Sequence, residues 1–309
     1  MRLIKPSFSI WDQQEGLEGV YKQIEKAGRV CYKSEDKITE DSAKGFVGRM
    51  VKSGHGAMLE HGTVYLKIPY GTMDDRGEFS NEPIVIKYID NPYSVVMNNS
   101  ENDYWYITSN YRVIIENGWI DDLQYLCEPT EFHAKRITVH FVCDRGVSHE
   151  FVRHRVMSFA QESTRYCNYS KDKFGNEIIY ILPSWVDMKQ LGEQNSQELL
   201  IQMGSLNNPT YSQEDLNELY FLFGLASSEI QYFNLIGKGW IAQQARAVLP
   251  NSLKTELVMT GFVSDWEHFF KLRDAGSAHP QARELAHPLH MEFLRRGYIT
   301  DLYNEANPD

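Results

Sequence analysis

The segment at residues 145–165 holds the densest set of side chains able to do chemistry. Four arginines and two histidines fall within these 21 residues, and apolar residues are threaded between them. Cations held against apolar surface need anionic partners, because burying an unpaired charge is costly. The planar guanidinium fork fits a phosphate group or the edge of a pyrimidine through two hydrogen bonds. The segment therefore favours a site for a small anionic ligand, with an arginine-rich surface turn or ion pairs between subunits as the structural alternatives.

The spacing of the histidines does not match that of a metal site. His149 and His154 resemble a metalloprotease pair, but such a pair needs positions i and i+4 and these two are five residues apart. His287 and His290 could share one face of a helix, yet no third ligand of a suitable type accompanies them. We therefore expect no metal site. A metal-dependent hydrolase and a nucleotide-sensing or RNA-binding module built on the arginine segment are the two rival functions.

The composition narrows the class of protein. The chain has 309 residues, of which 42% are hydrophobic and 24% charged, as in ordinary soluble enzymes. Its net charge of −11 argues against sequence-independent nucleic-acid binding, which depends on neutralising many phosphates. No apolar run approaches the roughly 20 residues of a membrane-spanning helix, and a secretory signal pattern is not seen. Four scattered cysteines are interpreted as reduced thiols: Cys31, Cys127, Cys143 and Cys167. We expect a cytoplasmic protein with no nucleic-acid or membrane partner.

Apolar periodicity predicts the elements that must position the arginine segment. Alternating residues indicate half-buried strands at residues 63–68 and 137–142. Helices are expected at residues 14–27, ended by Gly28, and from about residue 39 to just before Gly54. Residues 70–135 form an elaboration between the two strands. Its expected parts are strand-like pieces at 83–89 and 104–108 and a short helix near 118–127.

The last third of the chain is predicted to be helical. Capping boxes at residues 212–215 and 264–267 would each open a helix, and a final helix at 280–296 would end at Gly297. Strands early in the chain and helices late in it indicate an α+β fold. No linker or repeat divides the sequence, so we expect a single domain over residues 1–309.

A short motif inside the arginine segment resembles the signature of a known family. Arg153, His154 and Arg155 are followed after seven residues by Ser163, and Arg165-Tyr166 continues the pattern. This arrangement is similar to that of the flavin-dependent thymidylate synthases, the ThyX family. Further segments resemble this family in the same order along the chain: Arg29-Val-Cys-Tyr32, the His55-x4-Glu60-His61 block, Asn110-Tyr111-Arg112, Ala245-Arg246-x-x-Leu249-Pro250, and Leu272-Arg273 with His279-Pro-Gln281.

The resemblance implies a fold and two sets of contacts. The ThyX-type fold has a central antiparallel sheet with flanking helices and a helical C-terminal third. By resemblance, FAD would contact His55, Ala57, Glu60, Arg153, His154, Arg155, Val156, Gln161, His268 and His279. The nucleotide dUMP would contact Glu150, Arg153, Gln161, Glu162, Ser163, Thr164, Arg165, Arg246 and Arg273. Two places depart from the family pattern, since Gln161 stands where Glu is common and Phe262-Val-Ser264 replaces an Asn-x-Arg element.

The resemblance also implies a reaction. A methyltransferase of this family makes dTMP from dUMP with 5,10-methylenetetrahydrofolate and NADPH or NADH as co-substrates, through reduced FAD and without a cysteine nucleophile. Arg165 and Arg246 suit the phosphate of dUMP, and Arg273, the predicted catalytic residue, suits a uracil ring that gains negative charge. Ser163 would be a nucleotide ligand, because no His or Asp stands at triad spacing to activate it. The family's sites form between the subunits of a homotetramer.

Overall fold

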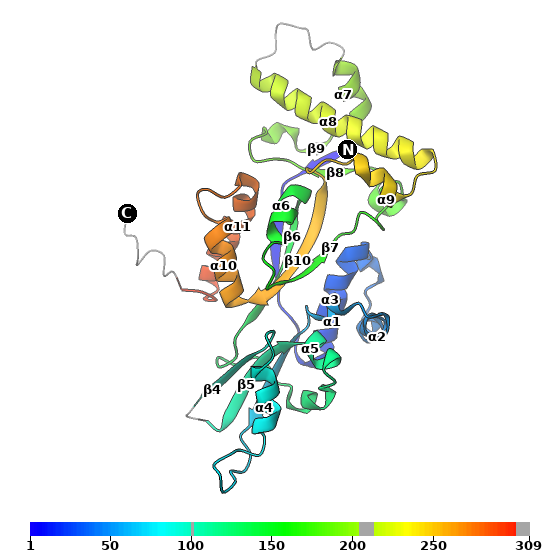
Figure 1. Cartoon of the computed structure of the whole chain (residues 1–309). Coiled ribbons are helices and arrows are strands. Elements are labelled where there is room, and N and C mark those ends of the chain that lie inside the picture. The colour runs from blue at the N-terminus through cyan, green and yellow to red at the C-terminus, as the bar shows by residue number, and fades with distance from the viewer. Residues whose placement is uncertain (100–101, 204–212, 301–309) are drawn as a thin grey trace, which may run out of the picture.

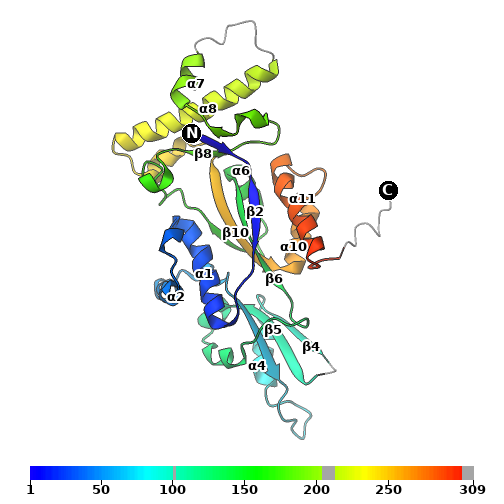
Figure 2. The same ribbon diagram turned by 180° about the vertical axis from the view of Figure 1, so that it is seen from behind.

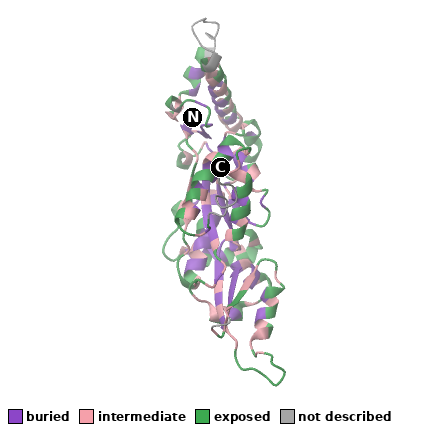
Figure 3. Ribbon diagram, turned by 90° about the vertical axis from the view of Figure 1, so that its left-hand side faces the viewer, coloured by how far each residue is buried: buried purple, intermediate pink, exposed green. Residues whose placement is uncertain are grey.

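The structure is a computed structural model that describes residues 1–99, 102–203 and 213–300. Three β-sheets follow one another along the long axis of the molecule (Figure 1). We call them the lower, central and upper sheets after their places in that view. Buried residues concentrate along the strands of the central and lower sheets (Figure 3).

The central sheet has four antiparallel strands in the order β2-β6-β10-β7. Their bounds are β2 Ser7–Trp11, β6 Arg136–Asp144, β10 Lys254–Phe262 and β7 Ser158–Gln161. The two middle strands pair along their whole length, from Lys254 opposite Asp144 to Phe262 opposite Arg136. Strand β6 therefore leads directly into the arginine segment, and β7 lies within that segment.

Helices cover both faces of the central sheet, because successive side chains of a strand point to opposite faces. Val139 and Met259 face the helical pair α10 and α11, whereas Val258 faces α1. Figure 2 shows α1 on one side of the sheet and α10 with α11 on the other. These helices are α1 Gly16–Tyr32, α10 Val263–Arg273 and α11 Pro280–Arg295.

The lower sheet has the antiparallel order β3-β5-β4, and its strands β4 and β5 belong to the elaboration. Its strands are β3 Thr63–Pro69, β5 Tyr104–Asn110 and β4 Val95–Asn99. The helices around it are α2 Ser42–Ser53, α3 Gly56–Leu59, α4 Glu82–Ile89, α5 Tyr111–Glu116 and the 3-10 helix η2 Ile120–Tyr125. Leu66, Ile107 and Phe46 lie in its core, together with Ile24 of α1. The long helix α1 thus contacts both the lower and the central sheet.

The upper sheet places β1 between β8, which runs parallel to it, and β9, which runs antiparallel. Its strands are β1 Arg2–Ile4, β8 Ile179–Ile181 and β9 Gly192–Glu193. The helices α7 Ser196–Met203, α8 Gln213–Gly237 and α9 Ala242–Ala245 lie beside it. The remaining elements are α6 Arg145–Phe151 and the 3-10 helices η1 Glu35–Lys37, η3 Asp172–Phe174, η4 Met188–Gln190 and η5 Arg246–Val248.

The α+β class, the central antiparallel sheet and its flanking helices agree with the sequence prediction. The prediction of a helical last third was incomplete, because it missed β10, a middle strand of the central sheet. The predicted strand at 83–89 is the helix α4, in which Val85 and Tyr88 are buried on one face. Gly28 does not end the first helix, which continues to Tyr32.

The two predicted capping boxes had different outcomes. The helix expected at 264 begins at Val263 instead, and Asp265 accepts a hydrogen bond from the backbone N–H of Phe262 at 2.8 Å. Ser212, on which the other box depends, lies outside the described residues. The single-domain organisation remains a prediction.

Candidate functional site

The arginine segment leaves the central sheet at the end of β6 and returns to it as β7. Asp144 begins the excursion, since its carboxylate accepts the backbone N–H of Val147 at 2.6 Å and so caps α6. The other oxygen of Asp144 accepts the side-chain amide of Gln281 at 2.6 Å. One buried carboxylate therefore fixes both the start of the segment and the start of α11.

Arg273 of α10 reaches across to this segment and makes three hydrogen bonds there. Its Nη1 donates to the Glu150 carboxylate at 2.7 Å, and its Nη2 donates to the carbonyl of Glu150 at 2.8 Å. Its Nε donates to Nε2 of His154 at 3.1 Å. Arg273 and His154 are 119 residues apart in sequence. The structure therefore brings together three predicted site residues through one guanidinium.

His154 is neutral in this arrangement. Its Nε2 must be the acceptor of the Arg273 hydrogen bond, because a guanidinium has donors only. Burial and the positive charges of Arg273 and His268 together lower the pKa of His154 to about 4. The His268 ring lies 5.8 Å from the His154 ring, centroid to centroid. His268 thus joins the same cluster.

The residues on either side of His154 are turned outward. Arg153, Arg155 and Val156 are exposed, whereas His154 is only 5% exposed. Within the part of the chain that the structure describes, neither the Arg153 nor the Arg155 guanidinium forms a hydrogen bond or an ion pair. Arginines without a carboxylate partner in a chain of net charge −11 are available for anions. The loop can therefore bind a phosphate-bearing ligand.

Gln161, at the end of β7, is held by side chains from two other elements. Its amide nitrogen donates to the hydroxyl of Ser148 at 2.8 Å and to that of Thr255 at 3.3 Å. Arg145 donates to the same Thr255 hydroxyl at 3.5 Å and to the carbonyl of Glu162 at 3.4 Å. Arg145 is not among the ligands predicted from the sequence, although this residue lies in the same arginine segment. Its position beside Gln161 makes it a further candidate site residue.

Glu162 turns inward instead of toward an open site. It is 2% exposed, and its carboxylate accepts from Lys254 at 2.9 Å and from the Tyr169 hydroxyl at 3.4 Å. Lys254 also contacts Glu256, which pairs with Lys33 at 2.9 Å. Hydrogen bonds from His140 and Lys254, together with the charge of Lys33, hold the pKa of Glu256 well below its usual range, against the effect of burial. Glu162 thus anchors the loop that follows β7.

The loop after Glu162 presents the remaining predicted nucleotide ligands. The backbone N–H of Ser163 donates to the carbonyl of Cys31 at 3.0 Å, which ties the loop to the end of α1. Arg246 donates from Nη1 to the Thr164 hydroxyl at 3.0 Å. Arg165 and Arg246 are both exposed. The structure thus places Arg246 beside the loop that carries Arg165, as the predicted phosphate role requires.

The predicted residues before β3 lie around the short helix α3. Glu60 accepts a hydrogen bond from Nη1 of Arg112 at 2.6 Å, and its carbonyl accepts from Nη1 of Arg136 at 3.1 Å. His55 and Ala57 are exposed at the start of this helix. Helix α3 contacts β7. The block therefore lies near the arginine segment, although no hydrogen bond among the described residues joins Glu60 to it.

His279 is the most separate of the predicted site residues. It is exposed immediately before α11, and its ring contacts the Trp185 ring at 5.9 Å. Apart from His279 and the outward-facing Arg153, Arg155 and Val156, the predicted residues form three groups in one chain: Glu150, His154, His268 and Arg273; Gln161 to Arg165 with Arg246; and His55, Ala57 and Glu60.

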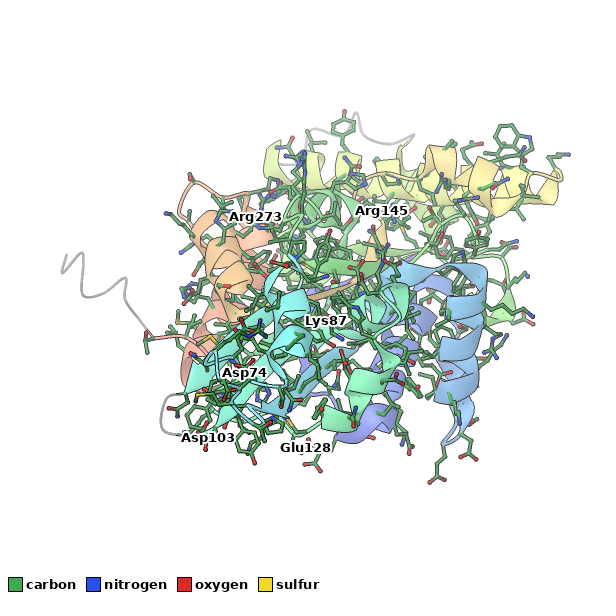
Figure 4. The ribbon with its side chains drawn as sticks, turned by 60° about the horizontal axis from the view of Figure 1, so that its bottom comes forward. Asp74, Lys87, Asp103, Glu128, Arg145 and Arg273 are labelled. Carbon is green, nitrogen blue, oxygen red and sulfur yellow. The ribbon has the colours of Figure 1, made fainter. Side chains whose placement is uncertain are left out.

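A cavity of about 350 Å³ lies elsewhere, between the loop that begins α1, the lower sheet and the start of β6. Tyr65, Glu128, Arg136 and Tyr298 are among its lining residues. Figure 4 shows Arg145 and Arg273 in the upper part of the view and Glu128 near the bottom. The predicted site residues thus do not line this cavity.

All four cysteines and most of the histidines lie outside the arginine segment. Burial raises the pKa of Cys31 to about 11 and that of Cys167 to about 12, so both thiols are protonated at neutral pH. His287 and His290 each hydrogen-bond Asp274 through Nδ1, at 3.0 and 2.8 Å. Across residues 1–99, 102–203 and 213–300, no group of three His, Cys, Asp or Glu side chains is arranged to hold a metal ion.

The fold defines an α+β protein that exposes several arginines around the segment between β6 and β7. No helix among the described residues is both long and apolar enough to cross a membrane. A model of the Thy1 family, described as "Thymidylate synthase complementing protein", matches residues 87–295. The chain belongs to this family, the flavin-dependent thymidylate synthases, and it is on that ground an enzyme. The resemblance of its motifs is thereby confirmed.

Individual relatives agree with this assignment. A flavin-dependent thymidylate synthase of Corynebacterium aurimucosum is 24% identical over 279 residues, covering 89% of this chain and 76% of the relative. The enzyme of the same name from Mycobacterium avium is 31% identical over 152 residues, 49% of this chain. That match spans about half of the relative, 53% of its length. Among solved structures, the UMP/dUMP methylase PolB of Streptomyces cacaoi, bound with 5-Br dUMP, aligns with 96% of this chain and 93% of its own. The sequence identity is 16% and the TM-score is 0.39.

Proposed function

We propose that this chain is an FAD-dependent thymidylate synthase, a methyltransferase that converts dUMP to dTMP. The one-carbon donor is 5,10-methylenetetrahydrofolate, and the reductant is NADPH or NADH. The observation that carries the proposal is the cluster in which Arg273 holds Glu150 and His154 at the centre of the family motif. The names of the relatives support the same reaction.

The donor set of the arginine segment fits FAD and a nucleotide. Arg153 and Arg155 expose guanidiniums that suit the phosphates of FAD, and Arg165 and Arg246 suit the phosphate of dUMP. FAD, when bound, supplies the redox and hydride chemistry that no side chain can provide. His55, Ala57, Glu60, His154, Val156, Gln161, His268 and His279 are proposed as the other FAD contacts on this chain.

Arg273 has the proposed catalytic role. Its guanidinium is held in one orientation because Glu150 accepts from two of its nitrogens. A uracil ring that becomes negatively charged during activation would be stabilised by a cation fixed in place beforehand. Neutral His154 completes this arrangement as an acceptor and adds no competing positive charge.

Ser163 and the cysteines are not proposed as nucleophiles. The partner of the Ser163 hydroxyl, in the residues described, is the backbone N–H of Arg165 at 3.4 Å, and this group cannot act as a base. The raised pKa values of the Cys31 and Cys167 thiols disfavour a thiolate. Both observations support a role for Ser163 in binding dUMP.

We further propose that the chain works as a homotetramer with sites shared between subunits. The three groups of site residues do not line the cavity of about 350 Å³, and each group includes exposed side chains that a second subunit could cover. Light scattering after size-exclusion chromatography tests the assembly, with four times the chain mass expected and a monomer contradicting it.

Product formation tests the proposed reaction. The purified protein is incubated with FAD, NADPH, methylenetetrahydrofolate and dUMP, and the nucleotides are analysed by mass spectrometry. We expect dTMP to form from the FAD-loaded protein only when NADPH, methylenetetrahydrofolate and dUMP are all present. Protein that retains FAD but forms no dTMP under these conditions would contradict the proposal.

A further inference from the structure

Two motifs that are far apart in sequence meet at helix α3. Asn110, Tyr111 and Arg112 end β5 and begin α5, which contacts α3 (Figure 1). The Arg112 guanidinium donates from Nη1 to Glu60 at 2.6 Å and from Nε to Glu116 at 2.7 Å. The contact between Arg112 and Glu60 therefore links the elaboration to the block that carries the proposed FAD contacts.

Backbone groups also contribute hydrogen bonds where α5 packs beside α3. The N–H of Tyr111 donates to the carbonyl of Gly62 at 2.9 Å, and the Asn110 side chain caps α5 by accepting from Val113 at 3.2 Å. A β-carbon at Gly56 would lie 2.8 Å from both Nε of Arg112 and Oε1 of Glu116. The arginine and its partner thus pack directly on the first residue of α3, and they could not hold this position against a larger side chain.

A second arginine holds Glu60 from its backbone side. Arg136 donates from Nη1 to the Glu60 carbonyl at 3.1 Å and to the Thr63 hydroxyl at 3.3 Å. Its Nη2 donates to Ser158 of β7 at 3.5 Å. Arg136 has no carboxylate ion pair within the described residues, so its donors serve these neutral oxygens. Glu60 is therefore fixed at its carboxylate by the elaboration and at its carbonyl by the first residue of β6.

We propose that the elaboration at residues 70–135 positions the FAD site, with Arg112 as the residue through which it acts on Glu60. Arg112 is a positioning residue, and Arg136, adjoining the elaboration, completes the clamp. The inference rests on the proposed function, because it takes Glu60 to be an FAD contact. It assigns the elaboration a role in cofactor binding.

The exposure of the Arg112–Glu60 ion pair indicates that it orients the Glu60 side chain more than it stabilises the fold. The side chains of Arg112 and Glu60 are 39% and 25% exposed. Ion pairs this exposed contribute little to overall stability. A contact that fixes the rotamer of a binding residue can nevertheless change ligand affinity, because a misplaced carboxylate loses its interaction with the ligand.

FAD affinity of the full chain, measured by quenching of flavin fluorescence, tests the inference. Arg112→Ala and Glu60→Ala should each weaken FAD binding by about threefold to thirtyfold, and the double variant should bind no more weakly than Glu60→Ala alone. Arg76→Ala is the matched control, since Arg76 lies in the same elaboration and its ion pairs within the described residues are with the exposed Asp74 and Glu78. It should bind FAD as the wild type does.

Arg112→Lys covers the case in which Arg112→Ala does not fold. Lysine keeps the charge but cannot serve Glu60 and Glu116 with the same fork. Weaker FAD binding and a shifted visible flavin band, at an unchanged melting temperature, would support the positioning role. Wild-type FAD affinity in the Arg112 variants, or effects that add in the double variant, would overturn it while leaving the proposed function intact. A wild-type protein that takes up no FAD would overturn the proposed function itself.

Discussion

Arg273 donates its Nε hydrogen to Nε2 of His154 at 3.1 Å, and this contact determines the charge of the histidine. The proton of the neutral ring must lie on Nδ1, because Nε2 is occupied as an acceptor. Protonation of Nε2 would place two donors against each other and would break the contact. The Arg273 cluster is therefore intact only while His154 is neutral.

The first prediction concerns the dependence of stability on pH. The folded state lowers the pKa of His154 to about 4 and that of His61 to about 3, from an ordinary value of 6.5. The unfolded chain therefore binds protons first, so this contribution to stability is complete above about pH 6.5 and is lost as the pH falls. Between about pH 6.5 and pH 5, each histidine should lower the free energy of unfolding by up to about 1.4 kcal/mol per pH unit.

Urea unfolding at several pH values measures this effect. His154→Asn should show a shallower loss of stability than the wild type, since it removes one of the two groups. The exposed His149 provides the matched control, and His149→Asn should keep the wild-type slope. Equal slopes in the His154 variant and the wild type would contradict the neutral-histidine assignment.

The second prediction concerns Arg273. Arg273→Ala should lower kcat by roughly a hundredfold, because it removes a fixed cation from the proposed transition-state site. Retention of FAD should change less than turnover. Steady-state kinetics and the flavin absorbance of the same preparations measure both quantities. A variant with the turnover of the wild type would rule out the proposed catalytic role.

The third prediction separates dUMP binding from FAD binding. Arg165→Lys keeps the positive charge but loses the planar fork, so dUMP affinity should fall by about tenfold to a hundredfold while FAD stays bound. Isothermal titration with dUMP measures the affinity. Arg76→Lys changes an exposed arginine of the elaboration and should leave the dUMP affinity unaltered. Unchanged dUMP affinity in Arg165→Lys would refute the phosphate assignment.

The fourth prediction concerns the packing of α1 on α2. A β-carbon at Gly28 would lie 2.5 Å from Cζ of the buried Phe46 ring. Gly28→Ala should therefore destabilise the protein by about 1–3 kcal/mol, although alanine favours helices. Gly48→Ala, in α2 with no atom within 4 Å of its added carbon, should stabilise by about 0.5–1 kcal/mol. Thermal melting distinguishes the two, and a stabilised Gly28→Ala would contradict this packing.

Elements with a strong local signal could be predicted from the sequence. The second helix ends at Gly54 because its C-cap adopts the left-handed conformation with φ of 69°. Strand β3 buries alternate residues, so its period of two is visible. Strand β10 was missed because it is buried on both faces and shows no alternation. In α4, β-branched residues suggested a strand, but burial of Val85 and Tyr88 against the lower sheet favoured a helix.

The candidate site likewise has residues that the sequence identifies and contacts that only the tertiary structure shows. The motif around His154 is contiguous, so its residues could be named from the sequence. The contact of Arg145 with Thr255 depends on the pairing of β6 with β10, which was not predicted. The contact of Arg112 with Glu60 joins positions 52 residues apart, and only the packing of α5 on α3 brings them together.

The absorbance spectrum of the purified full chain tests the central claim most directly, followed by NADPH oxidation with and without dUMP under low oxygen. An FAD-dependent thymidylate synthase should be yellow, with a flavin spectrum, and dUMP should stimulate the oxidation. Colourless protein that takes up no added FAD and does not respond to dUMP would contradict the claim. It would leave the arginine segment as a site that binds an anion without catalysis.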